Sequence, residues 1–140
     1  MPRLDDAQLD LLTSQAWEAR LNAYAPYSQF HVGAALLSAD GRVFSGANVE
    51  NASLGLTMCA ERVALGAAIS AGVRSIVAIA VAGESPSGIL PCGACRQALL
   101  EFSRSAVIVR CHPDGTHDTT SLASLDPAPF TGGVVELAGI

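Results

Sequence analysis

The sequence predicts an α/β fold, a three-layer α-β-α sandwich around a mixed sheet of about five strands. Patterns typical of helices alternate along the chain with short apolar runs typical of strands, and this alternation places helices on the faces of a sheet. An Asp-Gly pair at 40–41 separates two of the strand-like runs, which indicates a hairpin with antiparallel strands. The chain has 140 residues and is expected to form one domain over residues 1–140.

The first predicted element is an amphipathic helix from Asp5 to about Asn22. Its apolar residues recur at three- and four-residue steps, which is the spacing of one helix face. Asp5 or Asp6 is suited to cap its first turn, where acidic groups complement the helix dipole. The residues that carry this pattern are Leu9, Leu12, Ala16 and Ala19.

Strands are predicted on both sides of the Asp-Gly pair. Residues 30–38 and 42–46 are runs of mainly small and apolar side chains, and the pair between them is a strong hairpin signal. The polar stretch 47–53 then leads into a second helix. This helix is expected to begin at Cys59 and to run to about Ala71, where Gly72 ends it.

The second half of the chain alternates strand and helix. Residues 75–81 are almost continuously apolar, which is typical of a buried strand. The remaining predicted elements are a loop rich in Gly, Ser and Pro over 83–90, a helix over 92–102, a strand over 106–110, a turn at 113–115, one helical turn over 121–125 and an irregular tail.

Composition and charge exclude some classes of partner. The net charge is −5 and there is no run of Lys or Arg, so no nucleic acid polymer is expected as a partner. No stretch approaches the ~18 apolar residues of a membrane-spanning helix, so no membrane partner is expected. Half of the residues are hydrophobic and only 15% are charged. We therefore expect other subunits to cover part of the surface.

The four cysteines are expected to be reduced. The polar and acidic N-terminus does not resemble a secretory signal, which predicts a cytoplasmic protein. In that compartment metal ligands or buried thiols are favoured over two disulfides. Cys111, at the end of a predicted strand, is expected to be a buried free thiol.

Two short motifs place three thiols and one carboxylate at the starts of predicted helices. The first is C-A-E-R at 59–62, and the second, about thirty residues later, is P-C-G-A-C at 91–95. Unpaired N–H groups and the dipole at a helix start favour the thiolate form. A catalytic zinc site keeps three protein ligands and one open position. The spacing therefore predicts Zn²⁺ bound by Cys59, Cys92 and Cys95.

The residues beside Cys59 suit a catalytic site. Three thiolates bring more negative charge than Zn²⁺ neutralises, and Arg62 is within reach to offset it by donating hydrogen bonds to the sulfurs. Glu61 is expected to stay off the metal, to accept a proton from water and to pass it on. The alternative is a structural zinc site closed by a fourth ligand, for which the candidates are Cys111, His112, His117 and His31.

Stretches outside the two motifs extend the pattern. Residues 25–36, 46–53 and 91–97 resemble the small homotetrameric cytidine deaminases, and the resemblance runs from about Ala16 to Phe130. Zinc nucleobase deaminases have the same C-x-E and P-C-x-x-C arrangement, in which the Glu is not a zinc ligand. The resemblance implies a cytidine deaminase-like fold, a homotetramer, and hydrolysis of cytidine or 2′-deoxycytidine to the uridine nucleoside and ammonia.

The resemblance also implies roles for individual residues around the pocket. Asn48 and Glu50 match residues that hold the ribose hydroxyls, and Phe30 matches an aromatic wall of the pocket. The backbone N–H of Ala60 falls where the family contacts the base carbonyl. Phe130 resembles an aromatic residue that enters the site of a neighbouring subunit.

Three other functions share parts of this pattern. Deaminases of the blasticidin S type carry both cysteine motifs, but the loop at 48–53 is of the nucleoside type and favours a free nucleoside. Many polynucleotide editors have His in place of Cys59 and need basic grooves. A zinc-stabilised module without catalysis would be unaffected by Glu61→Gln. Two details complete the expectations: Leu54 replaces the Tyr of many relatives, and Gln97 is expected to brace Arg62.

Overall fold

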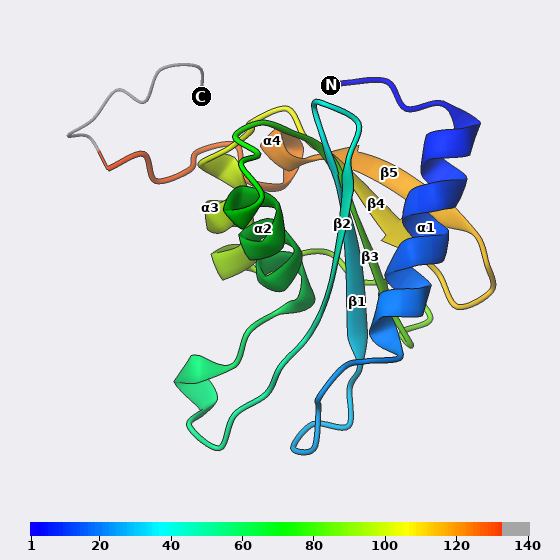
Figure 1. Cartoon of the computed structure of the whole chain (residues 1–140), viewed down its shortest axis with the longest axis vertical. Helices are drawn as coiled ribbons and strands as arrows, with labels where there is room; N and C mark the ends of the chain where they lie inside the picture. Colours follow the sequence, from blue (N-terminus) through cyan, green and yellow to red (C-terminus); the bar gives the residue numbers. More distant parts are fainter. Residues whose placement is uncertain (133–140) are drawn as a thin grey trace.

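The computed structural model describes residues 1–132, which form a three-layer α-β-α sandwich (Figure 1). The predicted fold class is confirmed, and residues 133–140 of the predicted domain lie outside the described residues. One sheet contains five strands in the order β2-β1-β3-β4-β5. The elements are α1 (Asp6–Arg20), β1 (Val32–Ser38), β2 (Val43–Ala47), η1 (Leu54–Leu56), α2 (Ala60–Ser70), β3 (Ile76–Gly83), α3 (Gly93–Leu100), β4 (Val107–Cys111), β5 (His117–Ser121) and α4 (Leu122–Leu125).

The sheet is mixed, as the hairpin signal predicts. β1 pairs antiparallel with β2 and with β3, β3 pairs parallel with β4, and β4 pairs antiparallel with β5. Figure 1 shows α1 on one face of the sheet and α2, α3 and α4 on the other. Parallel neighbours need a crossover connection, and α3 lies in the crossover from β3 to β4.

The sequence pattern did not locate β5 as a strand. Its residues are His-Asp-Thr-Thr-Ser, none of them fully buried, so it lacks the apolar run by which the other strands are recognised. Polar side chains are usual on an edge strand, where they discourage pairing with other chains. The other predicted boundaries lie within two residues of those observed. β1 begins at Val32 rather than Phe30, which leaves Phe30 in the preceding loop.

Each face of the sheet carries its own apolar core. On the α1 face, Leu12 and Ala16 pack with the inward residues of the central strands and with Cys111. On the other face, Leu65 of α2 and Leu99 of α3 belong to one buried cluster. The two helices that carry the cysteine motifs therefore share a core and lie on the same side of the sheet.

The N-terminus of α1 is capped as expected. The Asp5 carboxylate accepts the N–H of Gln8 at 2.7 Å, and the Gln8 side chain accepts the N–H of Asp5 at 3.0 Å. This reciprocal pair satisfies two N–H groups that the helix itself leaves without partners. Within the described residues, α1 and the other helices are too short or too polar to cross a membrane.

Glycines permit close contact between helices and strands at two places. At Gly33 of β1, an added Cβ would collide with the backbone of α1 at Ala16 and Arg20. At Gly46 of β2, it would lie 2.5 Å from the carbonyl oxygen of Ala60. The start of α2 is therefore seated directly on the backbone of β2, and this contact fixes the end of the helix that carries Cys59.

Candidate metal centre and active site

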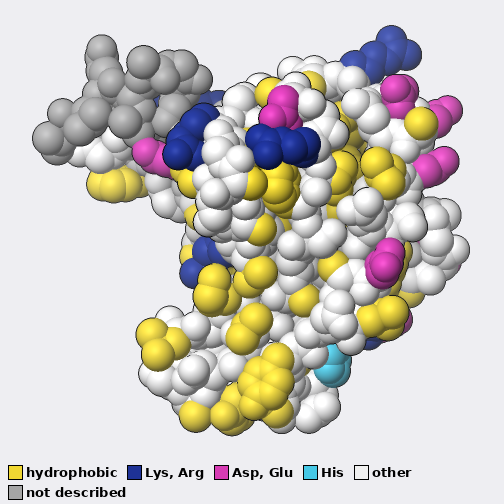
Figure 2. All heavy atoms as spheres, viewed as in Figure 1, with side chains coloured by type: hydrophobic (Ala, Val, Ile, Leu, Met, Phe, Trp, Pro, Cys, Tyr) yellow, Lys and Arg dark blue, Asp and Glu magenta, His cyan; other side chains and the backbone are white. Residues whose placement is uncertain are grey.

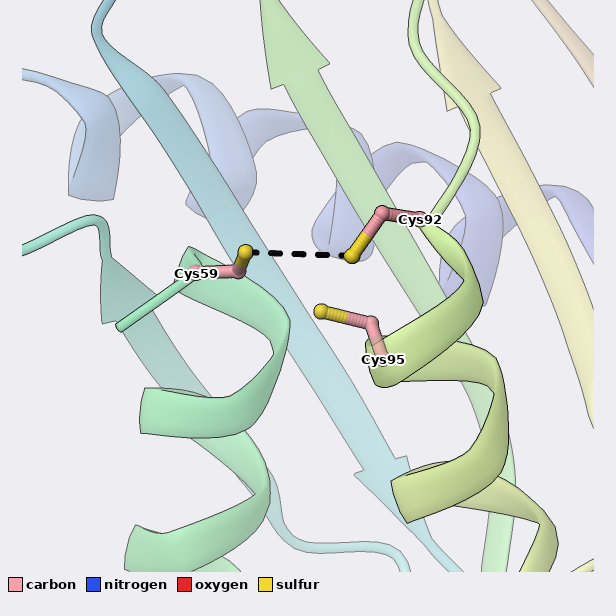
Figure 3. A group of neighbouring side chains, drawn as sticks. All are labelled: Cys59, Cys92 and Cys95. Atoms are coloured by element: carbon pink, nitrogen blue, oxygen red, sulfur yellow. Dashed lines mark hydrogen bonds between the residues drawn. The ribbon is translucent and has the colours of Figure 1, made fainter. Parts of the chain in front are cut away.

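Three cysteine side chains converge where α2 and α3 begin (Figure 3). Cys59 precedes α2 as its N-cap residue, Cys92 precedes α3 in the same position, and Cys95 lies in the first turn of α3. Their sulfur atoms all lie within 4.8 Å of one another, and those of Cys59 and Cys92 are 4.0 Å apart. All of these cysteines are free thiols, so the predicted grouping of the two motifs is observed.

The surroundings of Cys95 and Cys92 favour a cation between the three sulfurs. Cys95 is buried, and burial raises the pKa of its thiol, as do the negative charges of Glu61 and Cys59. Partial burial opposes ionisation of Cys92, but N–H groups at the start of α3 and the neighbouring thiols outweigh it and lower the pKa. Three thiolates this close together repel one another, a cation between them offsets that repulsion, and soft thiolate ligands suit Zn²⁺.

No fourth ligand closes the centre within residues 1–132. The group of mutually close ligand atoms there consists of the three sulfurs alone. Cys111, one candidate for a fourth ligand, lies in the core on the α1 face of the sheet, where burial raises its pKa to about 12. It is the buried free thiol that the sequence predicts. The described ligand set is therefore that of an open site rather than a closed structural one.

Arg62 lies beside the sulfurs, as its sequence position predicts. Its Nη2 is 3.5 Å from the Cys59 sulfur and also 3.5 Å from the carbonyl oxygen of Thr57. The contact with Cys59 raises the pKa of the guanidinium. Its Nε is buried and has no hydrogen-bond partner among residues 1–132. A fixed positive charge thus offsets part of the excess negative charge of the thiolates.

Glu61 is a buried carboxyl group next to the metal centre. It lies in the first turn of α2 and is only 4% exposed. Burial raises its pKa, against the opposing effects of its own N–H, of the Cys95 side chain and of the charge on Arg62. A carboxyl group with a raised pKa in a nearly dry position is suited to accept and return a proton.

The two residues predicted to hold ribose hydroxyls both bind the chain around the start of β1. The Asn48 side chain accepts the N–H of Val32 and donates to the carbonyl oxygen of Phe30, each at 2.8 Å. The Glu50 carboxylate accepts hydrogen bonds from the backbone of Tyr27 and from Ser28. These bonds, chiefly the one from the Ser28 hydroxyl, lower the pKa of Glu50.

The remaining predicted pocket residues differ widely in exposure. Phe30 is 38% exposed, and its ring edge lies close to Gly83 at the end of β3. Ala60 is fully buried, and its N–H is the first of α2, where the helix supplies no acceptor. Phe130 is 76% exposed, and its carbonyl oxygen accepts a hydrogen bond of 2.8 Å from Gln97.

Two side chains of α3, those of Gln97 and Arg96, make contacts that the sequence did not predict. Gln97 bonds to Phe130 rather than to Arg62, so the predicted brace is wrong: Gln97 holds the C-terminal segment instead. Arg96 donates to the carbonyl oxygen of Pro91 at 2.9 Å and to that of Leu125 at 3.3 Å. The sequence signal for Arg96 was its place directly after Cys95, four residues beyond Cys92 and so on the same helix face.

The fold and the site together define a zinc-dependent hydrolytic deaminase: a three-thiolate centre with an open position and a buried acid beside it, at two helix starts on one face of a mixed sheet. A family model described as "Cytidine and deoxycytidylate deaminase zinc-binding region" matches residues 6–111. The chain belongs to this family, and its metal is Zn²⁺.

Known proteins resemble the chain over most of its length. The cytidine deaminase of Halalkalibacterium halodurans is 57% identical over 122 residues, which cover 86% of this chain and 92% of the relative. The crystal structure of cytidine deaminase from Burkholderia pseudomallei is 49% identical, with a TM-score of 0.83 over 86% of this chain and 98% of that one. The crystal structure of cytidine deaminase from Mycobacterium leprae is 39% identical, with a TM-score of 0.75, and the match covers 88% of this chain and 100% of that one.

Proposed function

We propose that the protein hydrolyses cytidine and 2′-deoxycytidine to uridine and 2′-deoxyuridine with release of ammonia, a step of pyrimidine salvage. The observation that carries the proposal is the buried carboxyl group of Glu61 beside three converging cysteine sulfurs. Similarity to proteins named cytidine deaminase, at up to 57% identity, supports the choice of substrate.

In this proposal Cys59, Cys92 and Cys95 hold the zinc, which when bound supplies a Lewis acid that activates water near neutral pH. Glu61 accepts a proton from the attacking water and delivers it to ring N3 as oxygen adds to C4. The same carboxyl group then takes the remaining proton from the oxygen that has added to C4 and carries it to the amino group, the bond from C4 to nitrogen breaks, and ammonia leaves. The raised pKa of Glu61 suits a group that must both accept and donate within one turnover.

The other site residues bind and orient the nucleoside. The N–H of Ala60, the first in α2, donates to the base carbonyl. Phe30 forms one wall of the pocket, and Asn48 and Glu50 hold the ribose hydroxyls. Arg62 keeps the charge of the sulfurs partly neutralised, and this preserves the electrophilic character of the centre.

We also propose that the protein assembles as a homotetramer in which Phe130 enters the site of a neighbouring subunit. Apolar side chains gather on the surface around η1 and the loop before β1, at the lower end of Figure 2. An exposed patch of this kind marks an interface between proteins. Its residues are Tyr24, Tyr27, Val49, Leu54, Leu56 and Met58.

We further propose the domain organisation, the cellular compartment and the class of partner of this protein. Residues 1–140 form a single domain, with the one described sheet as its centre. The free thiols suit the reducing conditions of the cytoplasm. The net charge of −5 favours a small nucleoside over a nucleic acid polymer as the substrate, and no membrane partner is proposed.

The test is a cytidine-to-uridine assay with and without a chelator, with zinc content measured in the same samples. Turnover should follow zinc content and recover when zinc is restored. Blasticidin S and a cytosine-containing single-stranded oligonucleotide serve as competing substrates. Preference for blasticidin S, equal deamination of the oligonucleotide, or turnover that persists without metal would contradict the proposal.

A further inference from the structure

The hydroxyl group of Ser28 joins two residues on the sugar side of the proposed pocket. Its Oγ donates a hydrogen bond of 2.6 Å to the Glu50 carboxylate and accepts the N–H of Phe30 at 3.0 Å. Ser28 and Glu50 are 22 residues apart in the chain, and Ser28 is exposed rather than part of a core. One hydroxyl group therefore sets both the direction of a carboxylate and the backbone of an aromatic residue.

The turn around Ser28 holds this arrangement in place. Gln29, between Ser28 and Phe30, has φ of 61°, the left-handed region that non-glycine residues rarely adopt. Its N–H donates to the carbonyl oxygen of Ala25 and its side chain to that of Pro26, each at 3.0 Å. An unusual backbone conformation supported by several hydrogen bonds is typical of segments that hold functional groups.

The bonds to Glu50 leave a defined part of its carboxylate free. An ionised carboxylate has about four acceptor positions. The N–H of Tyr27 and the N–H and hydroxyl of Ser28 occupy three of them. The same bonds lower the pKa of Glu50, so at neutral pH it is an acceptor only. What remains is one acceptor direction, which suits a hydroxyl donor such as that of a sugar.

We propose that Ser28 is a positioning residue for nucleoside binding, which aims the free acceptor of Glu50 at a sugar hydroxyl and fixes the backbone of Phe30. This inference rests on the proposed function and deepens it, because it names the residue that orders the sugar side of the site. Ser28 itself does not take part in the chemical step, which occurs at the metal centre. Loss of the Ser28 hydroxyl should therefore weaken nucleoside binding and leave kcat nearly unchanged.

The experiment compares Ser28→Ala with Ser28→Thr in the zinc-loaded protein, with Ser105→Ala as a control that removes an exposed hydroxyl elsewhere. Ser28→Ala should raise KM for cytidine about tenfold, the effect of losing a hydrogen bond to a charged group, with kcat within about twofold. Ser28→Thr keeps the hydroxyl and should restore KM. With 2′,3′-dideoxycytidine, which lacks the 2′- and 3′-hydroxyls, the KM of Ser28→Ala should approach that of the wild type.

Two further measurements keep the outcomes distinct. In a double-mutant cycle, Ser28→Ala should add little to the effect of Glu50→Gln, because both act through the same carboxylate. Calorimetric binding of uridine gives a readout that needs no turnover. A wild-type enzyme that turns over cytidine while Ser28→Ala matches it in KM and uridine affinity would overturn this inference alone. A wild type that neither binds nor turns over nucleosides would overturn both this inference and the proposed function.

Discussion

Gly46 and Ala60 lie so close together that a Cβ atom on Gly46 would stand 2.5 Å from the carbonyl oxygen of Ala60. Ala60 directly follows Cys59, so the backbone of β2 sets the position of a metal ligand. A strand at the edge of the sheet is thereby coupled to the centre on one of its faces, although β2 itself supplies no ligand.

We expect Gly46→Ala to weaken both folding and zinc binding, because α2 must move away from β2 to admit the methyl group. Overpacking of this kind costs about 1–3 kcal/mol in the free energy of unfolding. The matched control is Gly66→Ala in the exposed part of α2, where an added Cβ meets nothing within 4 Å. That control should stabilise the protein by about 0.5–1 kcal/mol. Denaturant unfolding and zinc content after dialysis check both variants, and full zinc retention by Gly46→Ala would refute the coupling.

Glu61→Gln should abolish most of the activity while leaving the protein folded and zinc-loaded. The amide fills the same space but cannot carry protons, and general acid–base catalysis contributes about 10²–10⁴ in rate. The measurement is ammonia release from cytidine, with zinc analysis on the same sample. Glu101→Gln, at the exposed end of α3, is the control and should retain activity. Ammonia release near the wild-type rate by Glu61→Gln would remove Glu61 from its proposed role.

Arg62→Gln should lower zinc affinity by about 10–100-fold, the usual effect of losing a group that supports metal ligands. The reason is that the Nη2 hydrogen bond to the Cys59 sulfur is lost together with the positive charge. Arg74→Gln is a matched control, since Arg74 bonds to the carbonyl oxygens of Ile69 and Val73 near the opposite end of α2. Competition with a zinc-binding dye measures both affinities. Equal affinities in the two variants would show that the charge of Arg62 has no role at the centre.

The ion pair between β4 and β5 should contribute to stability at neutral pH and not in acid. Asp118 accepts hydrogen bonds from Arg110 and lies 2.7 Å from the His112 ring, and these partners, Arg110 first, lower its pKa below the ordinary 3.8. A carboxylate with a lowered pKa stabilises the fold above its unfolded pKa, and this stabilisation is lost as the pH falls through the folded value.

The substitution that tests this pair is Asp118→Asn. Because the Asp118 side chain is 44% exposed, we expect a loss in the free energy of unfolding below about 1 kcal/mol at pH 7, which shrinks as the pH falls below 3.8. Asp10→Asn on the exposed face of α1 is the control. Unfolding at several pH values measures the difference, and a difference that grows in acid would contradict the assigned sign.

Local patterns in the sequence were enough to predict the elements that carry the chemistry. The two cysteine motifs each lie at a helix start, and the apolar strand β3 runs between these helices in the chain. Both helices pack on the same face of the sheet, so the spacing of the motifs was enough to predict that Cys59 meets Cys92 and Cys95. The position of Arg62 beside Cys59 was predictable for the same reason, because residues three or four apart on a helix lie next to each other.

Contacts between residues that are far apart in the chain could not be predicted from local patterns. The link between Ser28 and Glu50 joins two loops that are 22 residues apart in the chain, with β1 and β2 between them, and nothing in the composition of either loop marks it. The predicted contact of Gln97 with Arg62 had no local pattern behind it, and the Gln97 side chain instead donates to the carbonyl oxygen of Phe130. β5 was missed because an edge strand needs no apolar run, and its pairing with β4 is visible only in three dimensions.

Cys111 lies in the core on the α1 face of the sheet, whereas the three convergent cysteines lie at the starts of α2 and α3 on the other face (Figure 1). Its thiol stays protonated and enclosed, whereas Cys92 is exposed and is shielded chiefly by coordination. An alkylating reagent should therefore spare the zinc-loaded native chain and modify it once a chelator has stripped the ion, with Cys111 silent in both cases. The fraction of chains labelled at Cys92 then reports the fraction of centres that have lost their metal.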